Sequence, residues 1–148
     1  MTPVRTKLIQ AYQASRIEVN ENKIRVAVVD DDESFARAIG RLLRAAGFET
    51  AVYPSAEAYL QDVAAAPVKC LVLDIQMGGM SGLDLGHRLV EMGAQIPVIY
   101  VTALEDGKCH DEARQIGCST LFHKPVSGRL LVEAIHSAVA PFSKITEP

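Results

Sequence analysis

The chain has 148 residues, of which 49% are hydrophobic and 22% are charged, so it can bury the core of one domain and is not a largely disordered protein. The formal net charge of −3 predicts no basic surface for nucleic acid. The sequence has no long apolar run and no apolar secretory signal near its start, so we expect no membrane span and a cytoplasmic location.

Short apolar segments that predict β-strands recur five times along the chain. The first, residues 24–29, is rich in β-branched residues and predicts a buried strand. The second, residues 48–53, mixes apolar and polar residues, as a strand at the edge of a sheet does. Three further strands are predicted at residues 70–73, 97–101 and 120–122. Cys70, within the third strand, is expected to behave as a small buried hydrophobic residue.

A segment with the periodicity of a helix follows each predicted strand. The apolar positions of the first helix recur at helical spacing, at Phe35, Ile39, Leu42, Leu43 and Ala46. Gly47 is placed to end that helix. Ser55, Ser81 and Ser127 are placed to cap three of the later helices, and Ser81 with Asp84 resembles a capping box.

The later helices differ in how much apolar surface they offer to a core. The third is expected to turn Leu85, Leu89 and Met92 inward, and the last carries Leu131, Ile135 and Ala138. The fourth, residues 106–116, is mostly polar and has the weakest apolar face, made of Cys109, Ala113 and Ile116.

Strict alternation of five strands and five helices predicts an α/β domain with a parallel sheet and helices on both faces. Right-handed crossovers bring the carboxyl end of every strand to the same edge of such a sheet. Ligands bind at that edge, where the strand order reverses. The residues that follow each strand are therefore the candidates for a functional site.

Ionisable or hydroxyl side chains follow four of the five predicted strands. Asp30 and Asp31 follow the first strand, Asp74 the third, Thr102 the fourth and Lys124 the fifth. Taken singly, these residues have ordinary interpretations: Asp30 and Asp32 as helix caps, Thr102 as a turn residue and Lys124 as a solvated charge. Their joint placement at one edge favours a site.

Three crowded carboxylates repel one another and need a cation, so the pattern predicts a metal site of Asp30, Asp31 and Asp74. Oxygen ligands with room for water suit Mg²⁺, and the backbone carbonyl of Gln76 is a candidate fourth ligand. Lys124 and Thr102 add a positive charge and a hydroxyl group. Together these groups suit an anionic phosphoryl group, with a carboxylate as its acceptor.

The chain resembles the receiver domain of two-component response regulators. The motifs that carry the resemblance are VVDDDESF, LVLDIQMGGMSGLDL, PVIYVTA and LFHKPV, within residues 23–140. The resemblance implies a doubly wound, flavodoxin-like (βα)5 fold with strand order 2-1-3-4-5. It divides the chain into an N-terminal arm (1–22), a receiver domain (23–140) and a C-terminal tail (141–148).

The resemblance also implies roles for individual residues. Asp74 would accept a phosphoryl group from a sensor histidine kinase or a histidine phosphotransfer protein, and the domain would catalyse its own Mg²⁺-dependent phosphorylation and slow dephosphorylation. Asp31 is expected to be the direct Mg²⁺ ligand of the acidic pair. Thr102 would bind a phosphoryl oxygen, and Lys124 belongs to a Lys–Pro pair whose peptide bond is usually cis in the family. Output is expected through protein contacts of the fourth helix, fifth strand and fifth helix.

Two departures from the family pattern stand out. Gly78 occupies a position where the family commonly has proline, which predicts a more flexible loop after Asp74. Leu121 stands where many members have the aromatic residue that responds to phosphorylation. The aromatic residue here is Phe122, one position later and therefore expected on the other face of the sheet.

Several alternatives remain open from the sequence. A haloacid-dehalogenase-type phosphatase would use Asp30 and Asp32 as an Asp-x-Asp pair, but it leaves Asp74 without a role and lacks an acidic pair after Lys124. The chain could also be the receiver part of a longer DNA-binding regulator. Residues 1–22 are either a loosely attached arm or a docking helix. A zinc site is disfavoured, because the spacing of its potential ligands matches no common pattern: Cys109, His110, Cys118 and His123.

Overall fold

Five parallel strands form a single sheet in the computed structural model, which describes residues 23–64, 67–105, 107–117 and 120–140. The strand order is β2-β1-β3-β4-β5, as predicted. The strands are β1 (Arg25–Val29), β2 (Glu49–Tyr53), β3 (Cys70–Asp74), β4 (Val98–Thr102) and β5 (Thr120–His123). Every neighbouring pair is parallel.

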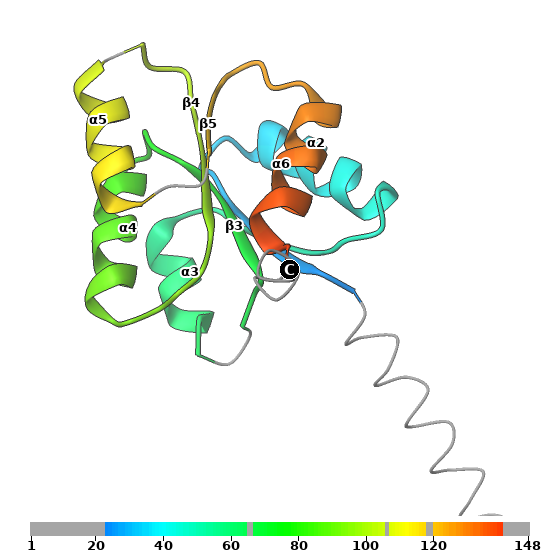
Figure 1. Cartoon of the computed structure of the whole chain (residues 1–148), viewed down its shortest axis with the longest axis horizontal. Coiled ribbons are helices and arrows are strands. Elements are labelled where there is room, and N and C mark those ends of the chain that lie inside the picture. The colour runs from blue at the N-terminus through cyan, green and yellow to red at the C-terminus, as the bar shows by residue number, and fades with distance from the viewer. Residues whose placement is uncertain (1–22, 65–66, 106, 118–119, 141–148) are drawn as a thin grey trace, which may run out of the picture.

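Helices cover both faces of the sheet (Figure 1). They are α2 (Glu33–Ala45), α3 (Ala56–Asp62), α4 (Gly82–Glu91), α5 (Gly107–Ile116) and α6 (Gly128–Val139). One apolar cluster joins the sheet to α2 and α6, and a second joins it to α3, α4 and α5. The two cores explain why β3 and β4 read as uninterrupted apolar runs: every residue of both strands is buried.

The predicted edge strand and the predicted caps are confirmed. β2 lies at one edge and is only partly buried. The side chains of Ser55, Ser81 and Ser127 each accept a backbone N–H at the start of a helix, and Ser81 and Asp84 form a capping box. Gly47 has a φ of 99°, the left-handed conformation that commonly follows a helix end.

The predicted burial of two residues at helix ends is wrong. Ala46 is exposed and Met92 is 53% exposed, because both lie beyond the last helical residue, at the C-cap position. The buried face of α2 includes Ala36 and Gly40. Phe35 is half-buried, packs against the cluster under α2 and α6, and has the ammonium group of Lys124 over its ring.

Strand β5 divides its apolar side chains between the two cores, as predicted. Leu121 packs with the cluster under α3, α4 and α5, whereas Phe122 packs with the cluster under α2 and α6. Cys70 is fully buried, and burial raises the pKa of its thiol to about 12. The structure therefore confirms Cys70 as a buried hydrophobic residue.

Three features predicted from the sequence lie outside the described residues: the N-terminal arm (1–22), the C-terminal tail (141–148) and Cys118. Among the helices that the structure describes, none combines the length and the apolar character needed to cross a membrane.

Candidate functional site

The register of the sheet brings the carboxylates of β1 and β3 together. Val29 pairs with Leu73, so Asp30 and Asp74 follow on adjacent strands. Asp74 pairs with Val101 of β4, which places Thr102 one residue beyond it on the other side. These three side chains are the only buried polar or charged ones among the described residues. The alternating pattern of strands and helices had predicted that these side chains lie close together at one edge of the sheet.

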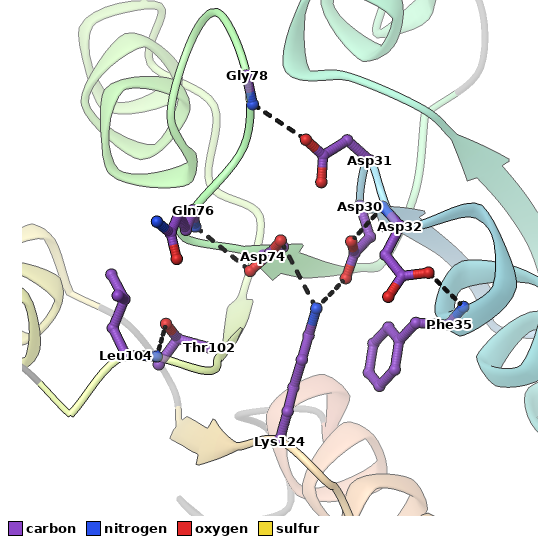
Figure 2. Close-up of polar contacts among 10 residues, drawn as sticks. All are labelled: Asp30, Asp31, Asp32, Phe35, Asp74, Gln76, Gly78, Thr102, Leu104 and Lys124. Atoms are coloured by element: carbon purple, nitrogen blue, oxygen red, sulfur yellow. Dashed lines mark hydrogen bonds and ion pairs between the residues drawn. The ribbon is translucent and has the colours of Figure 1, made fainter.

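Lys124 reaches the two buried carboxylates from the end of β5 (Figure 2). Its Nζ donates to Asp30 Oδ2 at 2.9 Å and lies 3.6 Å from Asp74 Oδ2. The peptide bond to Pro125 is cis, as the resemblance implied. The ordinary alternative for Lys124, a solvated charge, is wrong, because only 18% of its side chain is exposed.

The electrostatics of the site is governed by burial. Burial raises the pKa of Asp74 to about 6, and the neighbouring carboxylate of Asp30 adds to the rise, while Lys124 opposes it. Burial alone would lower the pKa of Lys124, but Asp30 and Asp74 outweigh it and raise that pKa. Asp74 is therefore mainly ionised above about pH 6 and lies against a firmly charged lysine.

Asp31 joins Asp30 and Asp74 in a group whose carboxylate oxygens lie within 4.8 Å of one another. Three carboxylates against one ammonium group leave a formal charge of −2 at this edge of the sheet. The residues fit a divalent cation with oxygen ligands, because they supply only oxygen atoms, and the exposed Asp31 leaves one side open to water.

The hydroxyl group of Thr102 faces its own loop. Its Oγ1 accepts the backbone N–H of Leu104 at 2.9 Å, so the turn interpretation holds for the structure described. The backbone N–H of Gln76 donates to Asp74 Oδ1 at 3.3 Å and fixes the orientation of that carboxylate. Both residues lie beside Asp74 in Figure 2, on the side away from Asp30.

Asp32 has the ordinary role suggested for it: its side chain caps α2 by accepting the Phe35 N–H at 3.1 Å. Asp30 is not a cap of this kind. Its Oδ1 accepts the Asp32 N–H at 2.8 Å, and its Oδ2 accepts from Lys124.

Sequence reasoning missed two contacts of the site. The Phe35 ring lies 4.2 Å from Lys124 Nζ and covers the lysine with an apolar, electron-rich surface. The backbone N–H of Gly78 donates to Asp31 Oδ2 at 3.0 Å. Neither contact has a periodic signal, because one depends on a rotamer and the other on a loop conformation. The glycine in place of proline at position 78 was the only available hint.

Two of the four residues of the disfavoured zinc site, His110 and His123, are in contact. The rings of His110 and His123 lie edge to face with centroids 4.9 Å apart. Within the part of the chain that the structure describes, however, the acidic group is the only set of three potential metal ligands.

A family model described as "Response regulator receiver domain" matches residues 26–136. The chain belongs to this family. As a receiver domain of two-component response regulators it is a signalling domain, and its membership contradicts the alternative of a haloacid-dehalogenase-type phosphatase.

The chain is similar to curated response regulator proteins. The chain is 35% identical over 138 residues to the response regulator protein TmoT of Ectopseudomonas mendocina, covering 92% of this chain and 63% of TmoT. It is 34% identical over 125 residues to TodT of Pseudomonas putida strain F1, covering 83% of this chain and 55% of TodT. The receiver thus spans little more than half the length of these relatives.

Solved structures agree with the fold. FixJ-N is 30% identical with a TM-score of 0.74, covering 80% of this receiver and 94% of that chain. The response regulator StyR is 35% identical with a TM-score of 0.74, covering 79% of this receiver and 59% of StyR. A CheY-like receiver from Methanospirillum hungatei is 22% identical with a TM-score of 0.78, covering 84% and 99%, and supports the fold.

Proposed function

We propose that this receiver accepts a phosphoryl group on Asp74 from a sensor histidine kinase or a histidine phosphotransfer protein. The observation that carries the proposal is a buried carboxylate, raised in pKa to about 6, lying 3.6 Å from Lys124 at the carboxyl edge of the sheet. Such a carboxylate is ionised at neutral pH and is flanked by the positive charge that an incoming phosphoryl group requires.

In the proposed reaction a carboxylate oxygen of Asp74 attacks the phosphorus of a phosphohistidine. The new P–O bond forms as the P–N bond breaks, and the imidazole leaves with the electron pair of that bond. Lys124 balances the charge on the transferred group, and the Thr102 hydroxyl is available to bind one of its oxygens once it leaves the Leu104 amide. Asp30, Asp31 and the carbonyl of Gln76, with Asp74, would hold Mg²⁺, which supplies charge neutralisation between acceptor and phosphoryl group.

Mass spectrometry after treatment with a small phosphodonor and Mg²⁺ tests the assignment. The full chain should gain one phosphoryl group, and Asp74→Asn should gain none. Asp32→Asn is a matched control, because asparagine also caps a helix and the change removes one carboxylate next to the site. It should be labelled like the wild type. Full labelling of Asp74→Asn would contradict the proposal, and slow loss of the label from the wild type would show weak autophosphatase activity.

We further propose that output leaves through the face formed by α5, β5 and α6. Ala113 is the only buried residue of α5, whereas α4 has five. Elements with little buried surface open at low free energy and are suited to switching. Thr102 holds the Leu104 amide just before α5, so movement of Thr102 would pull on that loop. His87 of α4 and Glu112 of α5, 3.0 Å apart, connect the two helices.

Hydrogen exchange with and without a stable phosphoryl mimic tests this route. Outside the site, the largest change is expected between residues 104 and 116. Unchanged amides there would contradict the route from Thr102 through this loop into α5, whichever other helix responds.

The biological setting is also a proposal. The relatives include the transcriptional regulatory protein TdiR of Thauera aromatica, which is 30% identical over 119 residues and of which this chain covers 52%. Two settings fit the receiver: a stand-alone protein that acts through protein contacts, or the receiver part of a longer DNA-binding regulator. We propose a cytoplasmic location, with residues 1–22 and 141–148 flanking a receiver domain of residues 23–140. The mass of the protein expressed from its own gene distinguishes the two settings.

A further inference from the structure

The exposed carboxylate of Asp31 is tied to a loop 47 residues away. Its Oδ2 accepts the backbone N–H of Gly78 at 3.0 Å, and its other oxygen points toward Asp30 and Asp74 (Figure 2). An exposed aspartate would otherwise sample several rotamers, because its side chain reaches into solvent. The amide therefore selects the orientation in which one oxygen remains available to the acidic group.

The loop that carries this amide is itself fixed. Glu57, at the start of α3, accepts the Met80 N–H at 3.0 Å, and this hydrogen bond lowers the pKa of the Glu57 carboxyl. On the other side, the Gly82 N–H donates to the Ile75 carbonyl at 2.8 Å. The Gly78 N–H is thus presented from a loop held by hydrogen bonds on both sides of it. Whether the glycine makes this loop more flexible than a proline would stays a prediction.

The amide also reduces the repulsion within the acidic group. A hydrogen bond from a backbone N–H to a carboxylate draws negative charge toward one oxygen and stabilises the ionised form. Because a carboxylate has two oxygens, the bond to Oδ2 is compatible with coordination through the other oxygen. The arrangement is that of an outer-shell donor that orients a metal ligand.

From this geometry we infer that the backbone N–H of Gly78 positions Asp31 for Mg²⁺. The inference rests on the proposed function, and it assigns the role to a main-chain group that proline cannot supply. In this receiver the glycine at position 78 is then part of the metal site, and its effect on the loop is secondary.

Substitutions at position 78 distinguish the effect of losing the backbone N–H from the effect of adding a side chain. Gly78→Ala keeps the N–H, and its Cβ would meet only Asp31 Oδ2 at 3.9 Å, in a backbone conformation without positive φ. Gly78→Pro removes the N–H. A Mg²⁺ titration of the full chain, followed by amide NMR shifts, should give about tenfold weaker binding for the proline variant. This is the lower end of the roughly 10–100-fold loss of metal affinity that follows removal of an outer-shell partner, because the contact here is exposed. The alanine variant should stay within about twofold of the wild type.

Proline also restricts Met77, so a second replacement isolates the hydrogen bond. L-lactic acid at position 78 has the shape of alanine with an ester oxygen in place of the N–H. The inference requires it to bind Mg²⁺ about as weakly as the proline variant. Equal affinity of the ester and alanine variants would overturn the inference. So would tighter binding of the ester, since the amide would then compete with the cation for Asp31.

The wild type distinguishes failure of this inference from failure of the proposed function. If the wild type binds Mg²⁺ and is phosphorylated on Asp74 while the ester and alanine variants bind alike, only the role of Gly78 is wrong. If the wild type shows no Mg²⁺ response, both are wrong. Metal-free unfolding of the variants, measured in parallel, reports any general damage to the fold.

Discussion

Neutralising the buried carboxylate of Asp74 should make the metal-free protein more stable. Asparagine resembles the protonated acid in size and keeps an oxygen that can accept the Gln76 N–H. The substitution therefore removes the cost of holding a charge in a buried position beside Asp30. The pKa of Asp74 is raised from 3.8 to about 6, and at roughly 1.4 kcal/mol per pKa unit this corresponds to about 3 kcal/mol.

The effect has a defined pH window. Because the pKa of Asp74 is higher in the folded state, the folded wild type holds this proton more tightly than the unfolded chain does. The contribution of Asp74 to the stability of the wild type is therefore lost as the pH rises from about 4 to above 6. Asp74→Asn lacks this loss, so the two proteins should differ by less than about 1 kcal/mol near pH 4 and by about 3 kcal/mol in favour of the variant above pH 7.

Urea unfolding followed by far-UV circular dichroism, in EDTA at pH 4 to 8, measures the difference; the chain has no tryptophan for a fluorescence signal. Asp111→Asn is the surface control, because the Asp111 side chain is 73% exposed, and its effect should be within about 0.5 kcal/mol. Adding Mg²⁺ should stabilise the wild type more than the variant and narrow the gap. A variant that is no more stable than the wild type at pH 7.5 would refute the reasoning.

Three further substitutions test other parts of the structure. Lys124→Met should raise the pKa of Asp74 further, since it removes the positive charge that lies 3.6 Å from Asp74 Oδ2, and a carboxyl ¹³C NMR titration that finds no rise would show that Lys124 is too hydrated to matter. Gly86→Ala should cost about 1–3 kcal/mol in urea unfolding, because its Cβ would lie 2.1 Å from the hydroxyl oxygen of Tyr100. Ser81→Ala should cost about 1 kcal/mol by the same measurement, through loss of the α4 cap; an unchanged midpoint would mean that the capping box contributes nothing net.

The fold was predictable because the hydrophobic periodicity of each segment indicates a strand or a helix, and strict alternation of the two is compatible with a parallel sheet covered by helices. A run such as residues 70–73 can be buried on both faces only inside a layered sheet, and parallel register then places Asp30 beside Asp74. The strand order came from the resemblance to receiver domains, because apolar patterning does not specify which strands are neighbours.

The finer structure of the site was not predictable for physical reasons. The contact between Phe35 and Lys124 depends on two side-chain rotamers. The bond between Asp31 and Gly78 depends on a loop that is held by Glu57, a residue without any motif. Met92 and Ala46 were misplaced because periodicity carries no information on where a helix stops.

The parallel sheet places the acidic group at its carboxyl edge and a set of glycine turns at its opposite, amino edge. Gly47, Gly93 and Gly117 follow α2, α4 and α5 with positive φ, and a Cβ at each would meet nothing within 4 Å. These turns lead back to the amino ends of β2, β4 and β5, a strand length away from Asp74. Exposed turns of this kind are where chains tolerate inserted sequence. A reporter peptide introduced after Gly93 would therefore sit at the opposite end of the domain from the carboxylates, making this turn the natural place to attach a probe for following the receiver in cells.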